Sequence, residues 1–241
     1  MEKIYIVMPA YNEAENIRQT VAQWYAVVNR INKEQQAEAY LVIANDGSRD
    51  GTYKEMCSMK ENGIYPFFQP LTKENGGHGQ TVLYLYRYAL IHGADYVFQT
   101  DSDGQTDPQE FWKMFEQRHT YDFQIGNRCK REDGMSRVLV TKVLRLTIWL
   151  MFHVWVLDAN TPFRLMEGKK LLRTMQVIPE DYFLCNVAIS AIAVKWGYKI
   201  RFCDISFKPR QGGVNSINMK RIIKIGWKAI SDFRKINANI K

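Results

Sequence analysis

Strand-like and helix-like segments alternate along the first half of this 241-residue chain, and this pattern constrains its fold most. Short apolar, β-rich runs precede longer stretches in which apolar residues recur at helical spacing, as Ile17, Val21 and Trp24 do. The alternation is typical of an α/β protein: a mostly parallel central sheet with helices on both faces. The expected strands are 4–8, 40–44, 64–69, 96–100 and 123–126, and the expected helices are 13–30, 50–61 and 80–92.

The composition fits one globular domain followed by a short appendage. Hydrophobic residues make up 46% of the chain and charged residues 24%, which suits a packed core rather than disorder. No Pro- or Ser-rich linker interrupts it, so we expect one domain over 1–218 and a C-terminal helix over 219–241. With no N-terminal signal sequence visible and no C-x-x-C spacing, free thiols in a cytoplasmic protein are expected. The cysteines are Cys57, Cys129, Cys185 and Cys203.

The positive charge of the chain is concentrated in 219–241. The net charge is +8, and seven of the basic residues but only one acid fall in this tail. The nearly neutral main body argues against nucleic acid as a partner. In the tail, Trp227, Ile230 and Phe233 recur at helical spacing among lysines and arginines, as in helices that lie on anionic membrane surfaces. A helix packed on the domain with a solvated basic face is the alternative.

The longest apolar stretch is 146–157, which is too short to span a bilayer. It is interrupted by Thr147 and His153 and preceded by Lys142 and Arg145. Three interpretations stay open for it: a core helix, a helix that lines an acceptor groove, and a helix that contacts lipid.

Two carboxylates, Asp101 and Asp103, directly follow the predicted strand 96–100. The carboxyl end of such a strand is where α/β sheets place ligands. Together with the amide oxygen of Gln105, these are hard oxygen donors, which suit Mg²⁺ or Mn²⁺ shared with the phosphates of a substrate. A solvated acidic turn is the alternative for this pattern alone.

Polar residues also follow the first two predicted strands. The segment 8–13 contains neither G-x-G-x-x-G nor a P-loop, which argues against a dehydrogenase or a P-loop NTPase. After the second strand, Asp46 is placed to accept a hydrogen bond from a base or a ribose, and Gly47 permits a tight turn. The run 76–79 opens a predicted helix, so its amides can meet phosphate; a plain turn, with His78 as a turn residue, explains it equally well.

Six ordered motifs resemble those of the family 2 inverting glycosyltransferases, most of all the dolichyl-phosphate mannosyltransferase-like branch with polyprenyl phosphate acceptors. They span nearly all of the chain. The resemblance implies a GT-A fold, in which a Rossmann-like nucleotide-binding half and an acceptor-binding half share one sheet. The motifs are Pro9-Ala10-Tyr11-Asn12-Glu13, Asn45-Asp46-Gly47-Ser48-x-Asp50-Gly51-Thr52, Asp101-Ser102-Asp103-Gly104-Gln105, Gly126-Asn127-Arg128, Asp158-x-x-x-Pro162-Phe163-Arg164 and Arg210-x-Gly212-Gly213-x-x-Ser216.

The resemblance also implies the partners and the site. The donor is a nucleotide diphosphate sugar, the acceptor a polyprenyl phosphate or lipid-linked molecule, and the enzyme lies on the inner face of a membrane. Arginines suit an acceptor phosphate because the guanidinium contacts two oxygens at once. The implied residues are Pro9, Tyr11, Glu13, Asn45, Asp46 and Asp101 for the nucleotide, Asp101, Asp103 and Gln105 for Mg²⁺ or Mn²⁺, and Arg128, Arg137 and Arg210 for the acceptor phosphate.

The acceptor stays open at this stage. Transfer to a sugar hydroxyl needs a general base, and Asp181, in a Glu-Asp pair resembling family members with sugar acceptors, is the candidate. A phosphate acceptor is already anionic and needs no base. Asn186 stands where the polyprenyl-phosphate branch often carries a carboxylate, and Asn45 where an aspartate is usual, so a non-catalytic sugar-nucleotide-binding subunit is a further hypothesis. The expected catalytic residues are Asp103, Arg128 and, for a sugar acceptor, Asp181.

Overall fold

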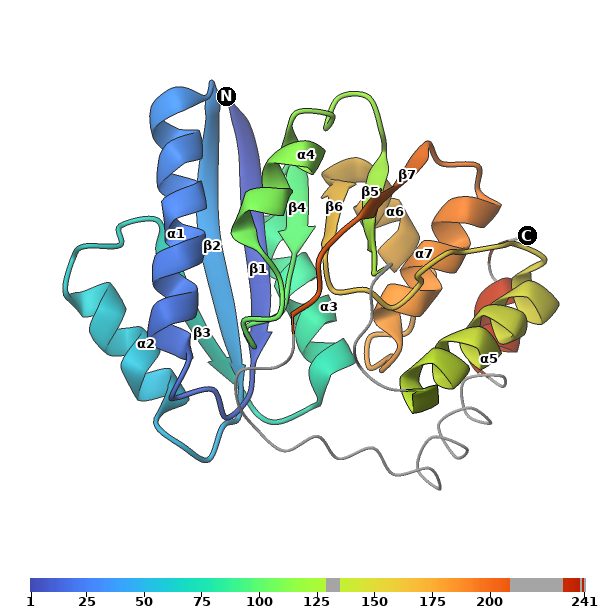
Figure 1. The fold of residues 1–241 in the computed structure, drawn as a ribbon, viewed down its shortest axis with the longest axis horizontal. Coiled ribbons are helices and arrows are strands. Elements are labelled where there is room, and N and C mark those ends of the chain that lie inside the picture. The colour runs from blue at the N-terminus through green and yellow to red at the C-terminus, as the bar shows by residue number, and fades with distance from the viewer. Residues whose placement is uncertain (129–134, 209–231, 239, 241) are drawn as a thin grey trace.

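A computed structural model describes residues 1–128, 135–208, 232–238 and 240, and only the backbone of 135–140. In this part of the chain, seven strands form one sheet in the order β3-β2-β1-β4-β6-β5-β7 (Figure 1). The β1–β2, β1–β4, β2–β3 and β5–β7 pairs are parallel, whereas β6 runs antiparallel to β4 and β5. The strands are β1 (Glu2–Ala10), β2 (Ala37–Asp46), β3 (Phe68–Lys73), β4 (Tyr96–Gln99), β5 (Phe123–Asn127), β6 (Arg164–Glu167) and β7 (Ile200–Asp204).

Helices cover both faces of the sheet, as the α/β expectation requires. Side chains alternate between the faces along each strand. In β1, Ile4 and Ile6 pack with α1, α2 and α4, whereas Tyr5 and Val7 pack with α3, α6 and α7. The helices are α1 (Ile17–Glu34), α2 (Thr52–Glu61), α3 (His78–Ile91), α4 (Phe111–Phe115), α5 (Met135–Phe152), α6 (Gly168–Met175) and α7 (Cys185–Lys195), with a 3-10 turn at Pro108–Glu110.

An aromatic cluster holds β4 in place just before the strand ends. The Phe98 ring lies 5.4 Å from Trp24 of α1, 4.9 Å from Phe111 of α4 and 4.8 Å from Phe163, measured between ring centroids. Offset and edge-to-face aromatic pairs stabilise beyond their buried area. The cluster therefore fixes the point at which the chain leaves the sheet for Asp101.

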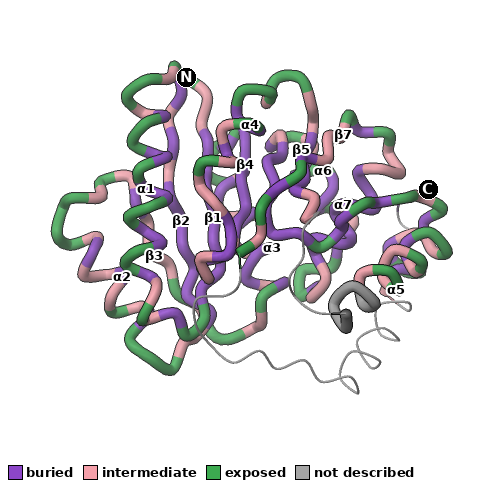
Figure 2. Tube along the Cα trace, in the orientation of Figure 1, coloured by how far each residue is buried: buried purple, intermediate pink, exposed green. Residues whose placement is uncertain are grey.

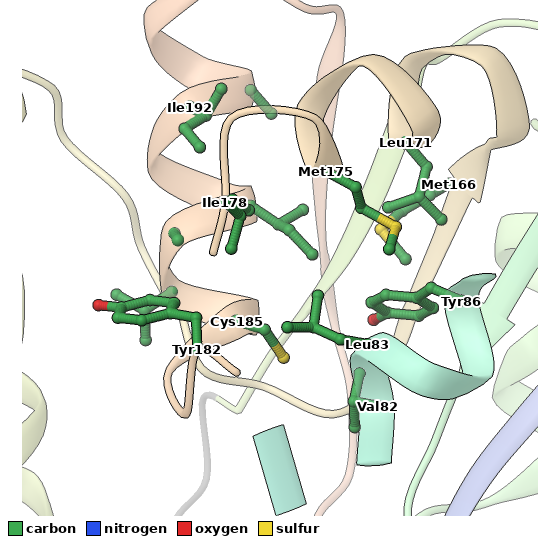
Figure 3. Packing of buried hydrophobic residues seen from close by; sticks show 14 of the residues in the cluster. Val82, Leu83, Tyr86, Met166, Leu171, Met175, Ile178, Tyr182, Cys185 and Ile192 are labelled. Atoms are coloured by element: carbon green, nitrogen blue, oxygen red, sulfur yellow. The ribbon is translucent and has the colours of Figure 1, made fainter. Parts of the chain in front are cut away.

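The opposite face of the sheet is packed by α3, α6 and α7. Figure 3 shows Leu83 and Tyr86 of α3 meeting Met175, Ile178 and Cys185 in one buried cluster. This layer holds the first turn of α3 beside the segment that precedes α7. Figure 2 shows the strands between the two helical layers as the most continuously buried part of the molecule.

The described end of the tail, 232–238, is helical and packs on the domain. Phe233 and Ile236 are fully buried, and the Phe233 ring lies 5.3 Å from Phe152 and 6.3 Å from Tyr182. These two apolar side chains therefore belong to the core. The expected boundary between 218 and 219 and the segment 219–231 lie outside the described residues.

Most predicted elements of the first half are present, but one strand is displaced. The predicted strand 64–69 is wrong in position, because β3 begins at Phe68. Ile64 is exposed, and a turn in which the Phe68 amide donates to the Tyr65 carbonyl leads into the strand. Because the turn also contains apolar residues, the sequence pattern predicted a strand that begins before Phe68. The strands β6 and β7 and the helices α6 and α7 were not predicted.

We expect Gly79→Ala to destabilise the protein, because α3 approaches the segment before α7 closely at this residue. An added Cβ would lie 2.1 Å from the Phe183 carbonyl oxygen, which is backbone and cannot move aside cheaply. Overpacking of this kind costs about 1–3 kcal/mol. The matched control is Gly51→Ala, whose Cβ meets nothing nearer than 4.0 Å. In urea unfolding, Gly79→Ala should have a lower free energy of unfolding than Gly51→Ala. Equal free energies for the two variants would contradict the close approach of α3 to Phe183.

Candidate active site

An open cleft of about 490 Å³ lies at the carboxyl ends of β1, β2 and β4. Val7 pairs with Gln99 and Ala10 with Asn45, so the parallel register brings the three strand ends to one edge of the sheet. This is the position at which α/β sheets bind ligands. The cleft is lined by Pro9, Ala10, Tyr11, Glu13, Asp46, Asn75, Gly77, His78, Asp101, Ser102 and Asp103.

Hydrogen bonds fix the turn that carries the two aspartates. The Ser102 hydroxyl donates to the Pro9 carbonyl at 2.9 Å, and the Thr20 hydroxyl donates to the Ser102 carbonyl at 3.1 Å. Ser102 is buried, and its anchoring leaves Asp101 and Asp103 lining the same cleft on either side of it. The predicted neighbourhood of the two carboxylates is therefore present.

His78 reaches Asp101 from the first residue of α3. Its Nε2 lies 3.0 Å from Asp101 Oδ1. Loss of hydration opposes protonation of the ring, but the carboxylates of Asp101, Asp103 and Asp46 outweigh it and raise the pKa of His78. Sequence reasoning treated His78 as a turn residue. The sequence feature that could have indicated a site residue is the position of His78 at the start of a predicted helix.

Asp46 holds the loop between β3 and α3 against the end of β2. Its Oδ1 accepts from Lys73 Nζ at 2.8 Å and from the Gly76 amide at 2.9 Å, and its Oδ2 accepts from the Gly77 amide at 2.9 Å. Desolvation opposes ionisation, but Lys73 and the Gly76 amide prevail and lower the pKa of Asp46. The glycine amides considered for phosphate thus bind a carboxylate of the protein. Asp46 shapes one wall of the cleft.

Two of the residues implied by the resemblance point elsewhere. The Asn45 side chain donates to the Thr72 hydroxyl at 2.9 Å and so ties β2 to β3. The buried Gln105 amide donates to the Lys208 carbonyl at 2.8 Å. Neither side chain is among those lining the described cleft. Of the three implied metal ligands, only the two aspartates line the cleft, while the Gln105 backbone amide donates to Asp103 Oδ1 at 3.2 Å.

Arg128 forms a two-point ion pair. Its Nε lies 2.7 Å from Asp158 Oδ2 and its Nη2 lies 2.8 Å from Asp158 Oδ1, with the guanidinium 5.1 Å above the Phe207 ring. Both side chains are largely buried. Arg137 falls in the stretch of α5 whose side chains are not described, and Arg210 lies outside the described residues. The acceptor-phosphate set therefore stays a prediction.

Asp181 lies away from the described cleft. It is exposed, and it borders a separate hollow of about 220 Å³ together with Tyr182, Phe183, Asp232 and Lys235. Its backbone carbonyl accepts from Gln80 Nε2 at 3.3 Å. The structure does not bring the candidate general base to the cleft that holds Asp101 and Asp103.

A buried polar network lies behind the end of β4. The Tyr86 hydroxyl contacts Gln99 Oε1 at 2.9 Å and Asn186 Oδ1 at 3.2 Å. The fully buried guanidinium of Arg164 donates to the Asn186 carbonyl and to the carbonyls of Ala159 and Thr161, at 2.6–3.1 Å. Arg164 therefore fastens the segment that carries Asp158 to α7. This anchoring role was not inferred from the sequence.

The residues of the cleft fit a divalent cation that a substrate helps to bind. Asp101 and Asp103 supply hard oxygen donors, and Glu13 adds negative charge, whereas Asp46 is paired with Lys73. In the described part of the chain, no three His, Cys, Asp or Glu side chains group together to hold a metal by themselves. Mg²⁺ typically binds one or two carboxylates and completes its coordination with phosphates and water. Without a cation, this acidic cleft would repel a diphosphate.

Comparisons with known proteins agree with this geometry. A family model described as glycosyl transferase family 2 matches residues 5–137. The chain is 25% identical over 205 residues to the UDP-N-acetylglucosamine–dolichyl-phosphate N-acetylglucosaminyltransferase of Methanococcus voltae, covering 77% of this chain and 78% of that protein. It is 23% identical over 149 residues to the undecaprenyl-phosphate 4-deoxy-4-formamido-L-arabinose transferase of Pectobacterium atrosepticum, covering 61% of this chain and 43% of that protein.

Solved structures share the fold. Glucosyl-3-phosphoglycerate synthase of Mycobacterium tuberculosis, in complex with Mn²⁺, UDP-glucose and phosphoglyceric acid, superposes with a TM-score of 0.69 at 13% identity, covering 98% of this chain and 80% of that one. Mannosyl-3-phosphoglycerate synthase of Rubrobacter xylanophilus gives 0.67 at 12% identity, covering 96% and 72%. The GT-A expectation is confirmed.

Among the described helices, none has the length and apolar character needed to cross a bilayer.

We expect the contribution of Asp46 to stability to depend on pH. Because folding lowers the pKa of Asp46, its stabilisation is complete above the unfolded value of about 3.9 and is lost as the pH falls through the folded value. Urea unfolding should give the wild type a higher free energy of unfolding than Asp46→Asn. We expect this difference to be largest near neutral pH and to shrink below about pH 4. Glu74→Gln, an exposed carboxylate in the same loop, is the control. A gap independent of pH would contradict the ion pair.

Arg128 and Asp158 should be energetically coupled. A double-mutant cycle with Arg128→Met and Asp158→Asn measures their interaction in urea unfolding, and contacting pairs give about 0.5–3 kcal/mol. Two short charge-assisted hydrogen bonds between largely buried partners should place the coupling in the upper half of that range. Additive single-variant effects would show that the pair does not hold the segment in place.

Proposed function

The chain belongs to glycosyl transferase family 2, and we propose that it transfers a sugar from a nucleotide diphosphate sugar to a polyprenyl phosphate. The transfer inverts the anomeric carbon and uses Mg²⁺ or Mn²⁺. The observation that carries this proposal is the joint position of Asp101 and Asp103 in one cleft with Tyr11 and Glu13. A carboxylate pair for a cation and an exposed ring for a base are what a sugar nucleotide requires.

The donor is held by two parts of the cleft. Tyr11 is 42% exposed there, so its ring is available to a nucleobase, while Pro9 and Glu13 border the same end. Asp101 and Asp103, which line the same cleft, would hold the cation. Bound Mg²⁺ or Mn²⁺ supplies the positive charge that stabilises the departing nucleoside diphosphate. Asp46, neutralised by Lys73, keeps the intervening wall in position.

A phosphate acceptor agrees with the place of Asp181. An anionic phosphate oxygen attacks without a general base, and the candidate base lies outside the described cleft. The named relatives act on dolichyl phosphate and undecaprenyl-phosphate substrates. We propose that Arg128, Arg137 and Arg210 bind the acceptor phosphate, with Arg128 oriented by Asp158.

We further propose that the enzyme works on the inner, cytoplasmic face of a membrane. Polyprenyl phosphates are membrane lipids, so the enzyme must meet a bilayer surface to reach them. The described cysteines, Cys57, Cys185 and Cys203, are free thiols, as a reducing compartment favours. The basic tail 219–241 adds attraction to anionic lipid.

The test replaces one cleft carboxylate. Asp103→Asn should lower Mn²⁺-dependent release of nucleoside diphosphate, in the presence of polyprenyl phosphate, by about 100-fold or more, the scale of losing a transition-state stabiliser. Asp107→Asn is the matched control, since Asp107 caps the turn at Pro108 outside the cleft lining and asparagine can cap as well.

Full activity of Asp103→Asn would refute the metal role. No release by the wild-type protein with any nucleotide sugar would favour the non-catalytic binding subunit instead. Circular dichroism of both variants checks that the fold is kept.

A further inference from the structure

A second hollow lies at the opposite end of the sheet from the cleft. The cleft opens beside Pro9 and Ala10 at the end of β1, whereas this hollow of about 300 Å³ is bordered by Lys3 and Tyr5 near the start of the strand. At about 3.3 Å per residue, roughly 15 Å of β1 separates the two. In Figure 1, the start of β1 lies beside the N mark, away from the strand ends that carry the cleft. It is called the aromatic hollow below, after the rings of Tyr5, Tyr40, Phe67, Tyr88 and His92.

Three separate parts of the fold contribute these rings. On the sheet, Tyr5 of β1 pairs with Tyr40 of β2, and their rings stack with centroids 4.9 Å apart. The Phe67 ring, from the turn before β3, meets Tyr40 edge-on at 5.9 Å. Tyr88 of α3 and His92, which directly follows the helix, stack at 4.1 Å. A flat ligand ring can therefore pack against aromatic walls that the sheet, the turn and the helix supply.

The two tyrosines on the sheet stay neutral near neutral pH. The Tyr40 hydroxyl donates to Glu38 Oε1 at 2.6 Å, and this bond raises the pKa of Tyr40 to about 12. Burial, together with Tyr88 and Glu38, raises the pKa of Tyr5. The bond also engages the Glu38 carboxylate, which is not among the groups that line the hollow. The rings therefore add no negative charge that would repel an anion.

Two lysines border the rings. Lys60 Nζ donates to the Pro66 carbonyl at 2.9 Å, and because an ammonium carries three donors, two remain available. Lys3 lies on the same face of β1 as Tyr5, and its ammonium has no hydrogen bond or ion pair within the part of the chain that the structure describes. The Asp95 carboxylate accepts from the Lys3 backbone amide at 2.8 Å and does not line the hollow. The hollow therefore offers positive charge and hydrogen-bond donors to an anion.

We propose that the aromatic hollow binds a nucleotide, with the base stacked against the rings and the phosphate at Lys3 and Lys60. Every nucleobase has a planar face that stacks on aromatic side chains, and ammonium groups bind phosphate as point charges. A saccharide would leave both ammonium groups without an anionic partner. A volume of about 300 Å³ lies at the lower end of the range of ligand pockets and suits one mononucleotide. The hollow is separate from the cleft, so the inference goes beyond the proposed function and does not depend on it.

Calorimetric titration of the full chain with AMP, GMP, UMP and CMP tests the inference. The titrations use Asp101→Asn combined with Asp103→Asn in excess EDTA, which removes metal-dependent binding in the cleft. At least one mononucleotide should bind, one per chain. Lys60→Gln in this background should weaken that binding at least about tenfold, the scale of one hydrogen bond to a charged group. Lys54→Gln, which replaces an exposed lysine of the same helix outside the hollow, is the matched control and should leave the affinity unchanged.

The rings have a control of their own. Phe67→Ala should weaken binding about fivefold or more, because the stacking of a base on an aromatic side chain is lost. Tyr65→Ala removes a ring of the same turn that packs on Tyr25 outside the hollow, and it should leave the affinity unchanged. Urea unfolding of each variant checks that the fold is kept, and Lys60→Gln still tests the inference if a ring variant is unstable.

Fragments of the ligand separate the contributions of its two halves. For the mononucleotide that binds, the nucleoside without phosphate and ribose 5-phosphate without a base should each bind at least about tenfold more weakly. Equal binding of ribose 5-phosphate, equal affinity of Lys60→Gln and Lys54→Gln, or no binding of any of the four mononucleotides at millimolar concentration would each overturn the inference. Glucose that binds as tightly as the mononucleotide would overturn it in favour of a saccharide site.

Failure of this inference is distinguishable from failure of the proposed function. Lys60→Gln in the otherwise wild-type chain should keep the Mn²⁺-dependent release of nucleoside diphosphate, because Lys60 is outside the cleft lining. A chain without transfer activity that still binds the mononucleotide would sink the proposed function alone. An active transferase that binds no mononucleotide in the cleft-variant titration would sink the proposal for the hollow alone.

Discussion

The parallel register of β1 with β2 and β4 is the constraint on which the site depends. Ala10 pairs with Asn45 and Val7 with Gln99, so three strands end at the same edge of the sheet. The residues that follow these strands therefore line one cleft. The packing of Phe98 against α1 and α4 holds β4 in that register. A shift by one residue would turn the buried side chains of a strand to the opposite face, so the core enforces the alignment.

Charge balance decides what the cleft can bind. Four carboxylates border it, and one of them, Asp46, is neutralised by Lys73 and two backbone amides. Asp101 and Asp103 then face the open space, with His78 beside Asp101. Such a surface attracts a cation and, through it, a diphosphate. The same reasoning explains why the glycine amides before α3 serve the protein rather than a phosphate.

The sequence located β1, β2, β4 and β5 because buried strands followed by turn residues are local patterns, although it ended β1 and β2 two residues early and misplaced β3. It missed contacts made across long separations: the Lys73–Asp46 pair, the bond from Gln105 to Lys208, and Asp158 beside Arg128. Motif resemblance assigns residue types to a site, but only tertiary structure shows which side chains are already engaged. The antiparallel strand β6 was missed because it begins and ends with charged residues, Arg164 and Glu167, and the burial of Arg164 depends on backbone carbonyls that only the fold brings to it.

The most direct measurement is calorimetric titration of the chain with UDP and with GDP, in Mn²⁺ and again in excess EDTA. If Asp101 and Asp103 bind a cation against the diphosphate, one nucleotide should bind with Mn²⁺, and its affinity should fall at least about tenfold in EDTA, a factor that corresponds to only about 1.4 kcal/mol of binding free energy. The metal dependence should disappear when both aspartates are replaced by asparagine. Equal affinity in Mn²⁺ and EDTA would contradict the account.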